Sequence, residues 1–188
     1  MTLIALDLDG TLEDSRVDMV GAVGRLRQRL WLLERSSQDF TAHVNRGMDH
    51  LYRFCFSDYL EQVGEAGLED LRQKYENEYG QHIAENTALY PGIRDAVIEL
   101  ETMGKLALVT NKPEGLSRAL LSELGLTAFF SAVIGGDTAS APKPSPVMLE
   151  AASAQTGRKS PVVMIGDSAG DVRCGKAFGA ATVWCAWG

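Results

Sequence analysis

Cysteine, histidine and basic residues are all scarce in this sequence. Its 188 residues include three cysteines and three histidines, and 18 Lys and Arg against 25 Asp and Glu give a net charge of −7. An odd, sparse set of cysteines without metal-site spacing favours a reducing compartment. The acidic balance argues against non-specific nucleic-acid binding, which needs a basic face.

Long apolar runs are also missing. No segment approaches the length of a membrane span, and the apolar run after Met1 is too short for a signal peptide and has no basic leader. We therefore expect no membrane partner and a cytoplasmic location. The length and the ordinary composition, 45% hydrophobic and 23% charged, predict one domain or one domain with an insertion.

The chain changes character twice. Residues 2–8 form a short apolar run that ends at a turn signal, which predicts a buried strand. From about residue 17 to 84, apolar residues recur at helical spacing without a convincing strand, which predicts an all-helical insertion. Beyond Pro91, the predicted strands are 105–109, 129–134, 161–165 and 181–185, and the predicted helices begin near Pro91 and cover 114–124, 144–154 and 171–178. This alternation predicts an α/β fold with a Rossmann-like parallel sheet covered on both faces.

Polar side chains follow the predicted strands, where open parallel sheets bind their ligands. They are Asp7 and Asp9 after the first strand, Thr110 and Asn111 after the next, Lys143 in a loop before a helix, and Asp167 with Asp171 after a later strand. Several carboxylates at one point repel each other unless protons or a cation intervene. Hard oxygen ligands fit Mg²⁺ better than zinc, and Lys143 fits as a point charge on a phosphate.

Each of these motifs, taken alone, has an ordinary structural interpretation. An Asp-Gly pair after a strand is usually a turn, Asp167-Ser168 can cap a helix, and Lys143 can be an exposed loop residue. Their joint occurrence in one fold order favours a site. Buried carboxylates without partners make no structural sense unless a metal is present.

Four motifs in order make this sequence similar to the haloacid dehalogenase superfamily, and within it to phosphoglycolate phosphatase-like members with a helical cap. The motifs are Asp7-Leu8-Asp9-Gly10-Thr11, then Val109-Thr110-Asn111, then Lys143-Pro144, and Gly166-Asp167-Ser168 followed by Asp171. The resemblance spans nearly the whole chain. It implies a Rossmann-like core domain of residues 1–15 and 87–188 and a helical cap domain of residues 16–86.

The resemblance implies a Mg²⁺-dependent phosphatase that acts on a small phosphorylated metabolite. Asp7 would attack phosphorus and form an aspartyl-phosphate, while Asp9 would protonate the leaving oxygen and then activate water. The implied catalytic set is Asp7, Asp9 and Lys143, the phosphoryl-binding set is Thr110, Asn111 and Lys143, and the metal set is Asp7, the backbone carbonyl of Asp9, and Asp167. Asp171 would orient Lys143 or reach the metal through water.

Two other functions stay open at this point. Asp9 favours phosphoryl transfer, because the true dehalogenases of the superfamily lack an acid/base aspartate at that position. A sugar phosphomutase of the same superfamily is one alternative, although those enzymes usually read Gly-Val where this chain has Gly10-Thr11. A non-catalytic phosphate-binding protein that kept the fold is the other. The sequence predicts neither the individual phosphate ester nor the oligomeric state.

Three further features extend or depart from the pattern. Arg46, before Gly47, would bind a substrate carboxylate if it faced the crevice, and is otherwise a solvated arginine at a helix end. Glu13 puts a charge where relatives usually carry an apolar residue, on the segment that leads to the insertion. The sequence ends at residues 186–188, where relatives commonly continue with a short strand and helix, so we expect an exposed sheet edge.

Overall fold

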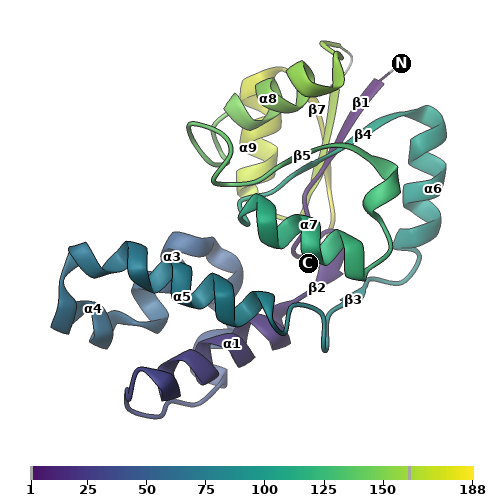
Figure 1. Cartoon of the computed structure of the whole chain (residues 1–188). Coiled ribbons are helices and arrows are strands. Elements are labelled where there is room, and N and C mark those ends of the chain that lie inside the picture. Colours follow the sequence, from purple (N-terminus) through teal and green to yellow (C-terminus); the bar gives the residue numbers. More distant parts are fainter. Residues whose placement is uncertain (1, 161) are drawn as a thin grey trace. The chain divides into compact units, whose positions relative to one another are not determined.

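The computed structural model describes residues 2–160 and 162–188 (Figure 1). Contacts between residues divide the chain into two compact units. One unit comprises Met1–Asp14 and Ala88–Gly188 and contains the sheet, and we call it the sheet unit. The other comprises Ser15–Thr87, and we call it the helical unit.

Five parallel strands form the sheet, in the order β5-β4-β1-β6-β7. They are β1 (Thr2–Leu6), β4 (Gly104–Val109), β5 (Phe130–Ile134), β6 (Val162–Gly166) and β7 (Ala181–Trp184). The central strand β1 pairs with β4 on one side and β6 on the other, so Ile4 lies opposite both Leu106 and Val163. Inner strands buried on both faces give continuous apolar runs, which is why the sequence pattern predicts them. Pro161, the first residue of one predicted strand, lies outside the described residues.

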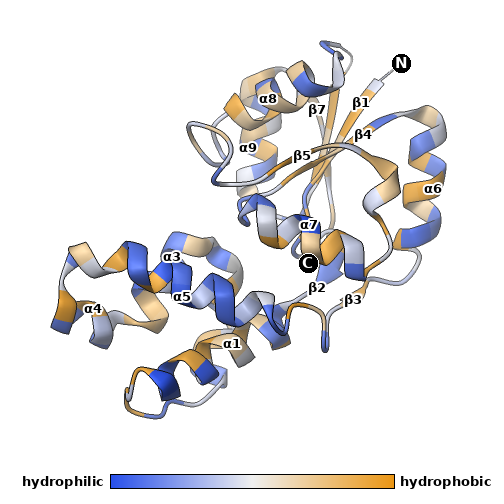
Figure 2. Cartoon of the chain, viewed as in Figure 1, coloured by the Kyte–Doolittle hydropathy of each residue, from blue (hydrophilic) through white to orange (hydrophobic). Residues whose placement is uncertain are grey.

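Helices cover both faces of this sheet. They are α6 (Ile93–Met103), α7 (Glu114–Glu123), α8 (Val147–Thr156) and α9 (Ala169–Phe178), with a 3-10 turn η3 (Thr127–Phe129) before β5. Figure 1 shows α8 and α9 on one face and α6 on the other. Leu3 and Ala5 of β1 belong to one buried cluster with Met148 of α8 and Cys174 of α9. Figure 2 shows apolar residues along the strands and mixed residues along the helices. The predicted α/β fold is confirmed.

Two helices begin elsewhere than the pattern predicts. Helix α8 begins at Val147 rather than at residue 144. Pro146 disfavours helical backbone at the residue before it, so the helix cannot extend further back. Helix α9 begins at Ala169 rather than at residue 171, because Ser168 caps it: the Ser168 hydroxyl accepts from the Asp171 N–H, and the Asp171 carboxylate accepts from the Ser168 N–H.

The helical unit packs around aromatic residues. Its helices are α1 (Arg16–Arg29), α2 (Gln38–Thr41), α3 (Met48–Cys55), α4 (Ser57–Val63) and α5 (Leu68–Gly80), with the 3-10 turns η1 (Val44–Arg46) and η2 (Glu65–Gly67). Tyr75 meets Tyr52 edge to face and stacks on Tyr79, and its hydroxyl donates to the Met19 carbonyl at 3.2 Å. Among the described residues, no helix has the length and apolar character that crossing a membrane requires.

A short antiparallel ladder in the sheet unit was not predicted. It pairs β2 (Glu13–Asp14) with β3 (Ala88–Leu89). A two-residue strand is too short to produce a periodic signal in the sequence. The ladder joins the two segments of the sheet unit that flank the helical unit in the chain.

Candidate active site

Adjacent strands end side by side and fix the backbone of the residues that follow them. The Asp7 N–H donates to the Ile165 carbonyl at 2.9 Å, and the Thr110 N–H donates to the Ile134 carbonyl at 3.0 Å. Both hydrogen bonds continue the parallel ladder by one residue beyond the named strands. Asp7 and Thr110 therefore stand on rigid backbone at the carboxyl edge of the sheet, where ligands of such folds bind.

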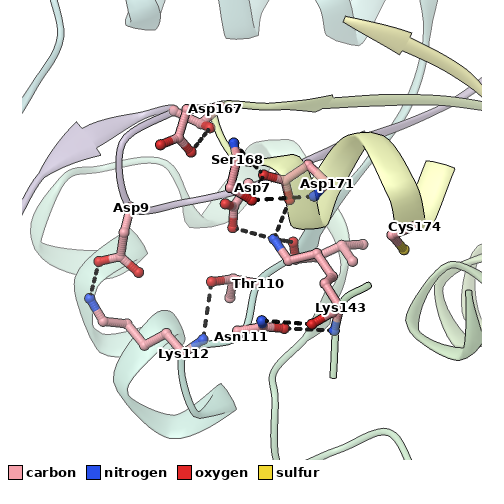
Figure 3. A network of polar contacts seen from close by, with 12 residues as sticks. Asp7, Asp9, Thr110, Asn111, Lys112, Lys143, Asp167, Ser168, Asp171 and Cys174 are labelled. Atoms are coloured by element: carbon pink, nitrogen blue, oxygen red, sulfur yellow. Dashed lines mark hydrogen bonds and ion pairs between the residues drawn. The ribbon is translucent and has the colours of Figure 1, made fainter. Parts of the chain in front are cut away.

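A buried ammonium joins two buried carboxylates at this edge (Figure 3). Lys143 Nζ lies 2.7 Å from Asp7 Oδ1 and 2.6 Å from Asp171 Oδ1, and it also donates to the Val109 carbonyl at 2.9 Å. Burial alone would lower the pKa of Lys143, but the two carboxylates outweigh burial and the pKa is raised. Lys143 is thus held as an ammonium beside Asp7.

The aspartates themselves are harder to ionise than usual. Burial raises the pKa of Asp7 to about 7, with Lys143 opposing the shift and Asp171 adding to it. Burial also raises the pKa of Asp167, although the Thr11 hydroxyl donates to its Oδ1 at 3.1 Å and opposes the shift. Both shifts mean that the protein surroundings do not fully stabilise the ionised form of either carboxyl group.

Three carboxylates gather closely enough to share a cation. One oxygen from each of Asp7, Asp167 and Asp171 lies within 4.8 Å of the others. Gly10 makes room for this arrangement, because it adopts a positive φ of 81° and a Cβ there would collide with the Asp167 carboxylate. Carboxylate oxygens are hard ligands and favour Mg²⁺ or a similar divalent ion over zinc. The cluster can therefore hold a divalent cation.

The Asp9 carboxylate has a different partner. Its Oδ1 forms an ion pair with Lys112 Nζ, from the loop between β4 and α7 (Figure 3). Lys112 is 2% exposed, and none of the sequence motifs identifies it. Its position directly after Asn111 places it near the strand ends, but nothing in the sequence indicates Asp9 as its partner. The carboxylates that lie together are therefore Asp7, Asp167 and Asp171, with Asp9 held separately.

Asn111 is turned towards the backbone of Lys143. Asn111 Nδ2 donates to the Lys143 carbonyl at 3.1 Å, and the Lys143 N–H donates to Asn111 Oδ1 at 2.8 Å. This pair of hydrogen bonds fixes the loop that carries Lys143. Thr110 is buried, and its hydroxyl accepts from the Lys112 N–H at 3.2 Å. Contact of Thr110 or Asn111 with a phosphoryl group stays a prediction.

Arg46 belongs to the helical unit. It is exposed and is the last residue of η1. Its charge, together with burial and the charges of His50 and Arg35, lowers the pKa of His43, with burial the largest cause. Arg46 therefore lies close enough to His43 for its charge to act on that ring. Its predicted contact with a substrate carboxylate stays a prediction.

Comparison with known proteins identifies the family. The model of the haloacid dehalogenase-like hydrolase family matches residues 4–185. The chain belongs to this family. A phosphoglycolate phosphatase from Chromobacterium violaceum is 33% identical over 188 residues, which cover 98% of this chain and 85% of the relative. One from Caulobacter vibrioides is 38% identical over 170 residues, which cover 89% of this chain and 72% of the relative.

Solved structures agree with this haloacid dehalogenase-like assignment. A crystal structure described as a predicted phosphoglycolate phosphatase from Haemophilus somnus 129pt has a TM-score of 0.86 and 26% identity, covering 99% of this chain and 85% of that one. The predicted family and the predicted enzyme class, a haloacid dehalogenase-like phosphatase, are confirmed. The substrate class is accordingly a phosphorylated compound.

Proposed function

We propose that this haloacid dehalogenase-like hydrolase cleaves a small phosphate monoester in a Mg²⁺-dependent reaction, with Asp7 as nucleophile. The observation that carries this proposal is the buried Lys143 ammonium shared by Asp7 and Asp171, beside Asp167. A carboxylate nucleophile must be ionised and held in one orientation. Lys143 favours the ionised form of Asp7 and fixes its Oδ1.

The reaction runs in two displacements at phosphorus. An oxygen of Asp7 attacks, the bond from phosphorus to the ester oxygen breaks, and Asp9 gives its proton to that leaving oxygen. Asp9 then takes a proton from water, the water oxygen attacks phosphorus, and the bond to Asp7 breaks. Phosphate leaves and both aspartates return to their starting forms. Lys143 holds the phosphoryl oxygens as a point charge.

The acidic cluster supplies the metal site in this proposal. Asp7, Asp167 and the backbone carbonyl of Asp9 would hold Mg²⁺, with Asp171 oriented towards Lys143. When bound, Mg²⁺ neutralises phosphoryl and carboxylate oxygens during in-line transfer. The raised pKa values of Asp7 and Asp167 support this, because a divalent cation stabilises the ionised form that burial disfavours.

We propose 2-phosphoglycolate as the substrate. Support comes from the relatives named phosphoglycolate phosphatase, which are 33% and 38% identical to the chain. A chain with a net charge of −7 needs local positive charge to attract an ester that carries both a phosphate and a carboxylate. Lys143 and Mg²⁺ would supply it at the phosphoryl group, and Arg46 is the proposed partner of the substrate carboxylate.

The test is a panel of phosphate esters with the purified protein, with Mg²⁺ or with EDTA. We expect phosphate release from 2-phosphoglycolate that EDTA abolishes. Asp7→Asn removes the nucleophile and should lower the rate by at least about 10³-fold, as nucleophile loss does in other enzymes. Asp95→Asn, an exposed aspartate on α6, is the matched control and should keep the wild-type rate.

Each alternative function predicts a different result. A sugar phosphate isomerised without phosphate release would indicate a phosphomutase. Binding of Mg²⁺ and phosphate without turnover of any ester would indicate a non-catalytic binding protein. Wild-type rates in Asp7→Asn would show that another residue attacks phosphorus.

A further inference from the structure

A second buried lysine lies against the other aspartate of the first motif. Lys143 contacts Asp7, and Lys112 contacts Asp9 (Figure 3). The side chain of Lys112 is 1% exposed and that of Asp9 is 18% exposed. Each reactive aspartate of the proposed mechanism thus has its own ammonium, supplied by a different loop.

The backbone holds Lys112 in place on both sides. Its N–H donates to the Thr110 hydroxyl at 3.2 Å, and its carbonyl accepts from the Gly136 N–H at 3.0 Å. Gly136 packs directly on the Asn111 backbone, where a Cβ would collide. The loop therefore presents the Lys112 side chain from a fixed base, and the ammonium does not need to be ordered by substrate.

Burying an ammonium costs free energy unless the group gains a close anionic partner. Lysine is one of the residues that folded proteins most rarely bury completely. The carboxylate that Lys112 meets is the proposed acid and base of the reaction rather than a surface acid. A charge-assisted hydrogen bond to Oδ1 restricts the side-chain torsions of Asp9 and so fixes the plane of its carboxyl group.

We propose that Lys112 is the positioning residue of Asp9, an inference that rests on the proposed function. The same Asp9 carboxyl group must first face the leaving oxygen and then face the attacking water. One fixed orientation serves both displacements, because both oxygens occupy the apical position opposite Asp7. Lys112 keeps its proton throughout and stays on Oδ1 of Asp9. The proton that moves is carried by Oδ2: it passes from Oδ2 to the leaving oxygen and from water back to Oδ2.

A double-mutant cycle tests whether Lys112 acts through Asp9. The four proteins are wild type, Lys112→Met, Asp9→Asn and the double variant, assayed for kcat and KM with Mg²⁺ and 2-phosphoglycolate. We expect Lys112→Met to lower kcat by about 10- to 100-fold, the cost of a misplaced catalytic group, with KM within about threefold of wild type. In the Asp9→Asn background the same substitution should change kcat by less than about threefold.

Two further variants separate positioning from folding. Lys112→Arg keeps a cation that can pair with Asp9 and should recover part of the lost kcat. Lys105→Met is the matched control, because Lys105 lies in the same strand–loop segment on β4, and its Nζ meets the Thr156 carbonyl at 3.5 Å. Lys105→Met should keep the wild-type kcat. If circular dichroism shows that Lys112→Met is unfolded, the cycle is run with Lys112→Gln, which keeps a polar side chain of similar length.

The outcomes distinguish the two proposals. Equal losses from Lys112→Met with and without Asp9 would overturn the positioning role, and so would a loss confined to KM, which would indicate direct contact with the substrate. Failure of wild type to release phosphate from any ester would overturn the proposed function instead.

Discussion

The helical unit and the sheet unit both bury charged side chains, but they surround them differently. In the helical unit, Arg27 is 2% exposed and meets both oxygens of Asp58 at 2.9 and 2.6 Å. It also donates to the carbonyls of Cys55 and Leu33. Each buried charge there faces an opposite charge or several donors, which is typical of groups that stabilise a fold.

The sheet unit instead gathers like charges. Oxygens of Asp7, Asp167 and Asp171 lie within 4.8 Å of one another, and Lys143 forms ion pairs with two of the three. Burial raises the pKa values of Asp7 and Asp167, and the neighbouring Asp171 carboxylate adds to both shifts. A buried charge alone therefore does not indicate an active site in this chain. A group of buried charges that the protein alone does not neutralise does indicate one.

The strongest test of this contrast removes one carboxylate from the cluster. Asp167→Asn should lower kcat/KM at a fixed Mg²⁺ concentration by at least about 100-fold, more than the loss of a residue that only orients a metal ligand. Its stability in EDTA should not fall, because the substitution also relieves repulsion among the carboxylates. The measurements are kcat/KM against Mg²⁺ concentration and the urea midpoint without metal.

Asp137→Asn is the matched control for this experiment. Asp137 is an exposed aspartate in the same unit, following β5, and it accepts a hydrogen bond from the Glu114 N–H at 2.8 Å. We expect an unchanged Mg²⁺ requirement. If Asp167→Asn also kept the wild-type Mg²⁺ requirement, Asp167 would not be a metal ligand.

The gathering of the cluster was predictable from the sequence, because it follows from topology. Parallel strands all end at one edge of the sheet, so Asp7, Thr110 and Asp167 meet there whatever the details of their loops. The apolar runs that identify the strands and the polar residues that follow them are both visible in the sequence. The resemblance to a known family then suggested a role for each of these polar residues.

The finer contacts were not predictable, because loop geometry decides them. Lys112 looks like any lysine after a strand until the turn of its loop brings it to Asp9. Asn111 looks like a ligand of phosphate, yet its amide is engaged with the Lys143 backbone. Hydrogen bonds between loops distant in sequence leave no periodic trace. One indirect indication of a second lysine is the number of predicted carboxylates at the strand ends, because several carboxylates close together need more than one cation to stabilise them.

The second test removes a compensated charge from the helical unit. Arg27→Met leaves two carbonyls and the partly exposed Asp58 carboxylate without their donor, and the loss of hydrogen bonds from a buried charged group costs about 2–3 kcal/mol. We expect a lower urea midpoint and faster amide exchange in the helical unit. This is the reverse of Asp167→Asn, which should lose activity and keep stability.

Arg53→Met is the control for Arg27→Met. Arg53 lies in α3 of the same unit, its side chain is 44% exposed, and its partners Asp49 and Glu65, at 3.0 and 2.7 Å, are 58% and 73% exposed. Exposed pairs contribute little to stability, so its urea midpoint should stay near that of wild type. Equal midpoints for the two variants would mean that the Arg27 contacts do not stabilise the helical unit.

The smallest expected effect concerns Asp18, near the start of α1. Its carboxylate accepts from the backbone N–H groups of Asn86 and Thr87 at 2.9 Å each, and from the Thr87 hydroxyl at 2.7 Å. These contacts join the beginning and the end of the helical unit. Burial acts to raise the pKa of Asp18, but the hydrogen bonds from Asn86 and Thr87 outweigh it and the pKa is lowered.

The sign of that shift predicts how Asp18 contributes to stability across pH. A lowered pKa in the folded chain means that the contribution is fully present above the ordinary value of 3.8 and is lost as the pH falls towards the folded value. Asp18→Asn should therefore lower the free energy of unfolding by about 1–2 kcal/mol at neutral pH, and the difference from wild type should shrink below about pH 4.

The control is Asp95→Asn, which removes an exposed first-turn aspartate from α6 and should lower the free energy of unfolding by less at neutral pH. A difference between Asp18→Asn and wild type that stayed constant down to pH 2 would show that ionisation of Asp18 does not stabilise the helical unit. In that case the Asp18 contacts would act as neutral hydrogen bonds, and the contrast with the charged cluster of the sheet unit would be sharper still.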